Sequence, residues 1–507
     1  MSWRMSRFRP EEKIFAYKSC KTAKARVESV LDECLVFCYD LRKCRRRASF
    51  EGSPPLPRTS HYSPGEVAWV SLGANLKPVL LFFLLWAVVP ALLATSAALS
   101  QQIVGSNVSD FGPEATGPGK GGGSGFGVDY SFKGGTDGAG PTASLIQDPA
   151  GNLYGTTSQG GNTDCGGVGC GTVFRVDTRN HETVLHVFTG GTSDGATPHG
   201  RLVMDESGNL YGTTSAGGNT GCGGAGCGTV FKIDSSGTEM VLYSFTGSPD
   251  GANPYAGPVM DGASELYGTT ENGGASNSGT VFKIDTSGNE TVLYSFNGGP
   301  SDGADPKADL TFDPAGNLYG TTYSGGSFGD GTVFELNTSG VETVLYSFTG
   351  GADGGNPFGG VTRDSTGALF GTVENGGSQS LDRQYQAGPE ISHGCCRGLV
   401  YELNGTGFSV LYTFTGNNDG GNPACDLALN NGVLYGTTLS GGPGHRGTAF
   451  SLTIATRSEG VLHGFTGKAD GGTPQAGLLM NGAGVLYGTA AGGGKNQKGT
   501  VFQYKLK

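Results

Sequence analysis

The sequence predicts an all-β fold, a seven-bladed β-propeller of four-stranded antiparallel blades, because one unit of roughly 50 residues recurs seven times. The first recurring block reads Leu-Tyr-Gly-Thr-Thr or a close variant, and its copies begin at Leu153, Leu210, Leu266, Leu318, Leu369, Leu434 and Leu486. The second reads Gly-Thr-Val-Phe or a variant, and its copies begin at Gly171, Gly228, Gly279, Gly331, Gly398, Gly447 and Gly499. Blocks that recur in a fixed order indicate a repeat architecture.

Two further blocks complete each unit. The third resembles Val-Leu-Tyr-Ser-Phe, and its copies end at Phe132, Phe188, Phe245, Phe296, Phe348, Phe414 and Phe465. The fourth follows an Asp-Gly-x-x-Pro turn, as at residues 200–205. All four blocks are short, rich in β-branched and aromatic residues, and bounded by Gly, Asp, Asn or Pro, which is typical of strands between tight turns. We therefore expect each unit to be a four-stranded meander, which matches a propeller blade better than a solenoid coil.

The two ends of the array predict how the ring closes. The array opens at residues 128–132 with a fourth-strand block and ends at residues 499–502 with a third-strand block. The last unit therefore lacks a fourth strand, and we expect the N-terminal strand to complete its sheet. Closure of this kind removes the exposed sheet edges that an open array would leave.

These blocks resemble the GloVer (Gloeo-Verruco) tandem repeat of "choice-of-anchor" exported bacterial proteins. The resemblance covers residues 128–502 and all seven units, and several blocks occur together in the same order. It implies an export signal, which members of that family commonly carry, and it brings no established activity.

The N-terminal region fits export. Residues 79–93 carry no charge, Lys77 precedes them, and residues 98–100 read Ala-Leu-Ser, a plausible cleavage site. The alternative is an uncleaved anchor over residues 79–99, which is long enough to span a membrane as a helix. We therefore divide the chain into a basic extension at 1–73, a signal peptide or anchor at 74–100, a Gly-rich linker at 101–127 and the propeller at 128–507. A wrongly assigned start codon would also explain the extension.

Charge is unevenly distributed along the chain. Residues 1–78 hold 15 Lys and Arg against 8 Asp and Glu, whereas the remainder holds 18 against 36. An acidic body repels phosphate, so we expect no nucleic-acid partner. The protein is expected to be an extracytoplasmic monomer that meets the membrane only through residues 79–99.

Three sets of loop residues are candidate sites, because variable loops on a rigid scaffold commonly carry binding. The residue after each turn proline varies while its neighbours repeat, which suggests either that it contacts a ligand or that it faces solvent with no constraint on its type. These residues are Thr142, His199, Tyr255, Lys307, Phe358, Ala424 and Gln475. The Asp-Gly pairs form an acidic set that either caps its own turns or attracts calcium: Asp137, Asp194, Asp250, Asp302, Asp353, Asp419 and Asp470. A long insertion at 374–397, with Arg383, Tyr385 and His393, is either a specific contact or a plain surface excursion.

The cysteines predict local disulfides. Cys165 and Cys170 bracket the sequence Gly-Gly-Val-Gly, and Cys222 and Cys227 bracket Gly-Gly-Ala-Gly. In an oxidising compartment each pair is expected to form a disulfide, and a shared thiolate metal site is the weaker alternative. A further bridge from Cys425 to one of residues 395–396 is also plausible.

No catalytic motif is recognisable in the chain: it has no nucleophile elbow, no His-Glu-x-x-His and no phosphate loop. The sequence therefore favours a non-catalytic binding or scaffold module at the cell envelope, without a cofactor, whose partner is a glycan or an envelope protein. The alternatives are a glycan-active hydrolase or lyase, in which two carboxylates converge in one pocket, and a purely structural surface protein.

Overall fold

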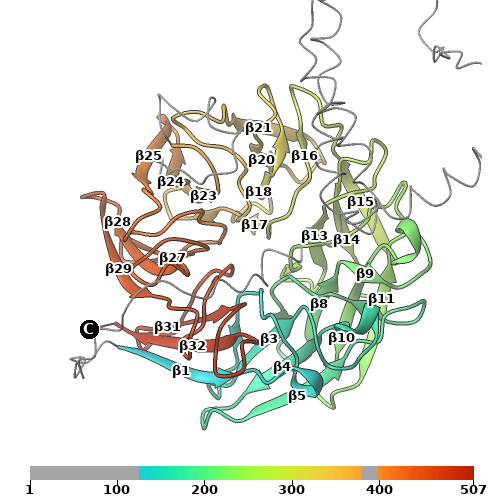
Figure 1. Ribbon diagram of the computed structural model, residues 1–507. Helices are drawn as coiled ribbons and strands as arrows, with labels where there is room; N and C mark the ends of the chain where they lie inside the picture. Colours follow the sequence, from blue (N-terminus) through green and yellow to red (C-terminus); the bar gives the residue numbers. More distant parts are fainter. Residues whose placement is uncertain (1–124, 378–396, 507) are drawn as a thin grey trace, which may run out of the picture. The chain divides into compact units, whose positions relative to one another are not determined.

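The computed structural model describes residues 125–377 and 397–506. Within these residues seven four-stranded antiparallel sheets are arranged in a ring (Figure 1), which confirms the predicted propeller. The basic extension and the apolar segment 79–99 lie outside the described residues, as does nearly all of the Gly-rich linker. Across the described part of the chain, no helix has the length and apolar character needed to cross a membrane.

Each blade runs from an inner strand beside the channel to an outer strand at the rim. The first four blades comprise β2 (Ile146–Gln147), β3 (Leu153–Thr157), β4 (Thr172–Val176) and β5 (Glu182–Val187); β7 (Val203–Met204), β8 (Leu210–Thr214), β10 (Thr229–Ile233) and β11 (Glu239–Ser244); β12 (Val259–Met260), β13 (Leu266–Thr270), β14 (Thr280–Ile284) and β15 (Glu290–Ser295); and β17 (Thr311–Phe312), β18 (Leu318–Thr322), β20 (Thr332–Leu336) and β21 (Glu342–Ser347).

The last three blades comprise β22 (Thr362–Arg363), β23 (Leu369–Val373), β24 (Leu399–Asn404) and β25 (Gly407–Thr413); β26 (Ala428–Asn430), β27 (Val433–Thr438), β28 (Thr448–Thr453) and β29 (Ser458–Gly464); and β30 (Leu479–Met480), β31 (Val485–Ala490), β32 (Thr500–Lys505) and β1 (Phe126–Ser131). Two short ladders join β6 (Gly195–Ala196) to β9 (Ala216–Gly217) and β16 (Gly303–Ala304) to β19 (Ser324–Gly325). The 3-10 turns are η2 (Gly135–Asp137), η3 (Cys165–Gly167) and η4 (Cys222–Gly224).

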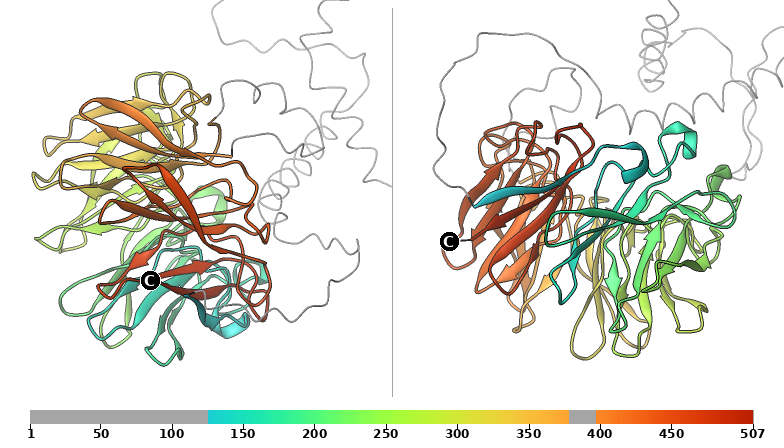
Figure 2. Two further views of the ribbon diagram at one scale, coloured as in Figure 1. Left: turned by 90° about the vertical axis from the view of Figure 1, so that its left-hand side faces the viewer. Right: turned by 90° about the horizontal axis from the view of Figure 1, so that it is seen from below.

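The seventh blade combines the two ends of the propeller. Strand β1 pairs antiparallel with β32, with Val128 opposite Phe502, and completes the sheet β1-β32-β31-β30. In Figures 1 and 2 the cyan β1 lies beside the red C-terminal strands. The Gln503 amide donates a 2.7 Å hydrogen bond to the Asp129 carboxylate, between residues 374 positions apart. The predicted closure is confirmed, and the closing strand begins at Phe126.

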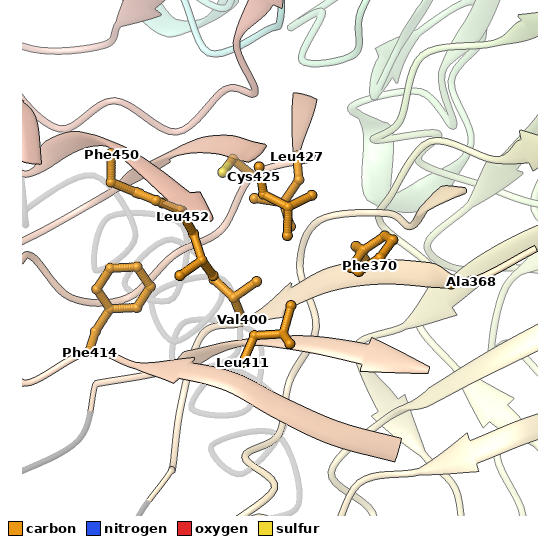
Figure 3. Packing of buried hydrophobic residues seen from close by; sticks show 10 residues of the cluster. Ala368, Phe370, Val400, Leu411, Phe414, Cys425, Leu427, Phe450 and Leu452 are labelled. Atoms are coloured by element: carbon orange, nitrogen blue, oxygen red, sulfur yellow. The ribbon is translucent and has the colours of Figure 1, made fainter. Parts of the chain in front are cut away.

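Aromatic contacts join each blade to the next. The phenylalanine that follows each outer strand packs edge-to-face against an aromatic ring of the third strand in the following blade. Ring centroids are 5.0 to 5.4 Å apart in Phe132–Phe174, Phe188–Phe231, Phe245–Phe282, Phe296–Phe334, Phe348–Tyr401, Phe414–Phe450 and Phe465–Phe502. Figure 3 shows the interface around Phe414 and Phe450, where Val400, Leu427 and Leu452 fill the remaining space.

Buried threonine pairs join the second and third strands within most blades. The two hydroxyl oxygens are 2.8 or 2.9 Å apart in Thr157–Thr172, Thr214–Thr229, Thr270–Thr280, Thr322–Thr332 and Thr438–Thr448. The fifth blade replaces both partners with the apolar pair Val373 and Leu399. The seventh blade replaces only one, so Ala490 lies opposite Thr500, whose buried hydroxyl has no partner among the described residues.

Replacing Ala490 with Thr is therefore expected to stabilise the protein. An unsatisfied buried hydroxyl costs free energy, and the new hydroxyl restores the pair found in five other blades; we expect a gain of about 1 kcal/mol in the free energy of unfolding. Denaturant unfolding of A490T measures this gain. Thr322→Ala, which creates the same defect in the fourth blade by removing the partner of Thr332, is the control and should lose a similar amount. Unchanged or lower stability of A490T contradicts the analysis.

Candidate binding site in the central channel

The turn prolines direct the chain into the channel of the ring. In the last six blades the residue before each proline has a left-handed backbone, as at Asn253 (φ 56°) and Asn356 (φ 58°), and Gly140 (φ 63°) takes this position in the first blade. Asparagine tolerates this conformation. The Asn253 amide also donates to the Ser215 carbonyl at 2.8 Å, which ties the turn to the preceding blade.

The position after each proline lines one cavity of about 60 Å³ at the mouth of this channel. The structure thereby brings together the five candidates His199, Tyr255, Lys307, Phe358 and Gln475, along with Thr142 and Ala424. All but Ala424 are half-buried, so they face the channel without being sealed in the core. The residues that vary between units while their neighbours repeat therefore lie on the channel wall.

Three of these residues form an aromatic cluster. The rings of His199 and Tyr255 stack with centroids 4.4 Å apart and planes 11° from parallel. Phe358 meets Tyr255 edge-on at 5.4 Å. Burial lowers the pKa of His199 to about 4, so its imidazole is neutral at neutral pH. The result is an uncharged aromatic surface on one side of the mouth.

Lys307 places a cation beside this surface. Its ammonium lies 3.0 Å from a carboxylate oxygen of Glu271 and 4.6 Å from the ring centroid of Tyr323, a cation–π distance. Glu374 adds a second carboxylate, and burial raises its pKa while Lys307 and a hydrogen bond from Tyr323 oppose the rise. The mouth thus combines an aromatic surface with one cation and two acidic groups.

Sequence reasoning missed Glu271, Tyr323 and Glu374. Each directly follows a Leu-Tyr-Gly-Thr-Thr block or its variant, a position occupied in the other blades by Ser158, Ser215, Leu439 and Ala491. This variability beside an invariant block is the same signal that singled out the residues after the prolines. It would have identified these three residues, which surround Lys307 at the mouth of the channel.

The third residue after each proline forms the waist of the channel, where Arg201, Asp309 and Asp426 project among Gly257, Gly360, Gly477 and Ser144. Arg201 Nε lies 3.2 Å from Asp309 Oδ2, and the Gly257 amide donates to Asp309 Oδ1 at 2.8 Å. Burial raises the pKa of Asp309 to about 7; Arg201 opposes the rise and Asp426 adds to it. A second cavity of about 250 Å³ adjoins the waist and is lined by residues of the inner strands, among them Thr311, Thr362 and Met480.

The seven aspartates of the Asp-Gly pairs lie outside the two channel cavities. Each carboxylate accepts a backbone amide of its own turn, as Asp250 does from Thr246 at 3.0 Å. Most also bond the tyrosine or histidine of the preceding outer strand; Tyr243 Oη donates to Asp250 at 2.7 Å. These contacts place the aspartates as turn caps at the blade interfaces.

Five glutamates of the following blades stand beside these aspartates: Glu182, Glu239, Glu290, Glu342 and Glu459. Burial raises their pKa values, and the neighbouring aspartate adds to the rise. The pKa of Glu182, Glu290, Glu342 and Glu459 reaches about 7, and that of Glu239 is raised by burial and by Asp194. Phe408 stands at this position against Tyr346, and Phe126 against His463. The sequence did not predict these pairs, because they form between different blades.

The cysteine prediction is confirmed for both local pairs. Cys165–Cys170 and Cys222–Cys227 are disulfides with Cα–Cα distances of 5.3 and 5.2 Å. Cys425 is a buried thiol whose sulfur lies 3.2 Å from the Thr437 amide nitrogen. Its suggested partners, Cys395 and Cys396, lie outside the described residues, as do Arg383, Tyr385 and His393 of the insertion.

Comparisons with known proteins agree with the repeat analysis. The model of the Gloeobacter/Verrucomicrobia repeat matches residues 120–225, 220–382 and 392–507. No curated protein matches the chain. Among solved structures, TolB from Acinetobacter baumannii is 13% identical, with 57% of this chain and 58% of TolB aligned and a TM-score of 0.33. A protein assigned as a gluconolactonase is 10% identical over 75% of this chain and 91% of its own, with a TM-score of 0.36.

The glutamates at the blade interfaces predict a dependence of stability on pH. The pKa of Glu342 is about 7 in the folded chain and roughly 4.3 when unfolded, so between these values the unfolded chain binds fewer protons and stability falls as the pH rises. We expect Glu342→Gln to have the melting temperature of the wild type at about pH 4.5 and a higher melting temperature than the wild type at about pH 7.5.

Thermal melts across this range test the expectation. Glu206→Gln, on an exposed turn, is the control and should follow the wild type throughout. A difference between Glu342→Gln and wild type that does not change with pH contradicts the assignment of a raised pKa.

Proposed function

Because this chain belongs to the Gloeobacter/Verrucomicrobia repeat family, whose model matches most of its length, we propose that its propeller is an extracytoplasmic, non-catalytic binding module whose ligand enters the mouth of the central channel. The observation that carries the proposal is the half-buried cluster of His199, Tyr255 and Phe358 on the channel wall. Aromatic rings that converge with a few polar groups in a concave site are characteristic of small-molecule recognition.

The charges of the channel favour a neutral or amine-bearing glycan over an anionic one. Glu271, Glu374, Asp309 and Asp426 supply four carboxyl groups, whereas Lys307 and Arg201 supply two cations, and both cations are paired with or close to these carboxyl groups. A uronic acid or phosphorylated sugar would meet this acidic excess, while hydroxyl or ammonium groups find acceptors. The aromatic surface suits the apolar face of a sugar ring.

Two observations support an extracytoplasmic location. The disulfides Cys165–Cys170 and Cys222–Cys227 form in an oxidising compartment. The uncharged segment at residues 79–93 has the composition of an export signal. We propose that the propeller acts at the cell envelope as a monomer, bound to a glycan and not to nucleic acid.

A second candidate function is glycan cleavage, which the carboxyl groups of Asp309 and Asp426 at the waist favour. One raised pKa beside a second acid is the arrangement of a general acid and its partner. However, Asp309 is already engaged by Arg201 and by the Gly257 amide, so these contacts also suit a fixed structural ion pair. The Asp309→Asn variant separates the two, because cleavage requires the carboxyl group.

An array of neutral, amino and uronic-acid oligosaccharides, probed with the full chain, tests the binding function. We expect binding to neutral or amino sugars, and a loss of about tenfold in affinity for Tyr255→Ala or Phe358→Ala, because each removes a stacking ring. Phe328→Ala is the matched control, since Phe328 is 61% exposed and lines neither channel cavity.

The outcomes separate the candidate functions. Binding that survives Tyr255→Ala and Phe358→Ala, or no binding to any glycan class, contradicts the proposed site. Release of sugar by the wild type that is lost in Asp309→Asn would establish the enzymatic alternative instead.

A further inference from the structure

The interface between the first and second blades holds a cluster of three possible metal ligands. His186 lies on β5, Asp194 lies in the turn that enters the second blade, and Glu239 begins β11. One ligand atom from each lies within 4.8 Å of the other two, and His186 Nε2 is 3.4 Å from Asp194 Oδ1. The cluster is separate from the channel, so its role is independent of the proposed glycan site.

This combination occurs once among the seven described blade interfaces. Five interfaces place a tyrosine where the first has His186: Tyr130, Tyr243, Tyr294, Tyr346 and Tyr412. The remaining interface, between the sixth and seventh blades, also has a histidine, His463, which lies 3.1 Å from Asp470. There, however, Phe126 stacks on the imidazole at 3.6 Å in the place of the glutamate. Within the part of the chain that the structure describes, imidazole, aspartate and glutamate therefore coincide only at His186, Asp194 and Glu239.

The carboxylate of Asp194 is held in place by its own turn, and its distance to His186 suits a shared metal ion. The Asp194 carboxylate accepts hydrogen bonds from the Thr189 amide on Oδ2 and from the Gly195 amide on Oδ1, both at 2.7 Å. Hydrogen bonds of this kind hold a metal-binding carboxylate in position. Glu239 Oε1 is buried without a hydrogen-bond partner among the described residues, as is the same atom of Glu182, Glu290, Glu342 and Glu459, so His186 and not the glutamate distinguishes this interface. The spacing of His186 and Asp194 agrees with the edge of a zinc tetrahedron, which is about 3.3 Å for ligand distances of about 2.0 Å.

We infer that His186, Asp194 and Glu239 bind a divalent transition metal, for which zinc has the best fit. One imidazole with two carboxylates suits zinc, whereas calcium and magnesium prefer an all-oxygen shell with more ligands. The side chains of His186 and Asp194 keep 19% and 10% of their surface exposed, so a water molecule can complete the coordination. The ion links the outer strands of two neighbouring blades.

Equilibrium dialysis of the full chain against zinc tests this site. His186→Tyr is the decisive variant, because tyrosine occupies this position in five other interfaces and bonds the aspartate there, so the fold is expected to be retained. His463→Tyr is the matched control, since it removes a histidine from an interface that lacks the glutamate. We expect the wild type and His463→Tyr to bind one more zinc per chain than His186→Tyr.

Two further measurements make the result specific. The wild-type-minus-His186→Tyr spectrum with Co²⁺ should show ligand-field bands without thiolate charge transfer, which separates this site from the cysteines elsewhere in the chain. Glu239→Gln should weaken zinc binding and abolish the zinc-induced rise in melting temperature. Equal zinc binding by the wild type and His186→Tyr, or a difference spectrum with thiolate bands, would overturn the assignment.

Discussion

The edge-to-face contact between the phenylalanine that follows one blade and the third strand of the next is the interaction on which this protein depends. A single four-stranded blade has two faces and cannot bury both alone, so each sheet needs neighbours on both sides. Phe132, Phe188 and their five equivalents make the same edge-to-face contact at every blade interface. The seven contacts join the blades into a closed ring whose inner strands surround the channel.

The fold followed from the sequence because repeated blocks report directly on repeated geometry. The mouth residues were accessible for a related reason: His199, Tyr255 and Phe358 vary beside a constant proline, and variation at a fixed place in a rigid unit marks a wall position. The waist was not accessible, because Arg201, Asp309 and Asp426 acquire meaning only when three different blades bring them to one point. The same limitation hid Glu239, whose partners His186 and Asp194 come before its own blade begins.

The acidic residues divide into two populations with different physical roles. The aspartates of the Asp-Gly pairs are committed to their own turns, and the glutamates beside them stand between blades. The carboxyl groups of the channel occur at positions where the residue type changes from unit to unit, and they stand next to cations and aromatic rings. A large number of acidic residues therefore says little by itself; what distinguishes a candidate binding group is that its residue type is not shared by all seven units.

The pairing of β1 with β32 has a consequence for how the molecule acquires its structure. The strand that is synthesised first in the propeller finds its partner only when the last strand is available, so the seventh sheet is assembled from the first and the last strand of the propeller. Long-range pairing of this kind slows folding and makes it cooperative. A nascent or shortened chain would present two unpaired sheet edges to its surroundings, and such edges are sites of aggregation until the seventh sheet is complete.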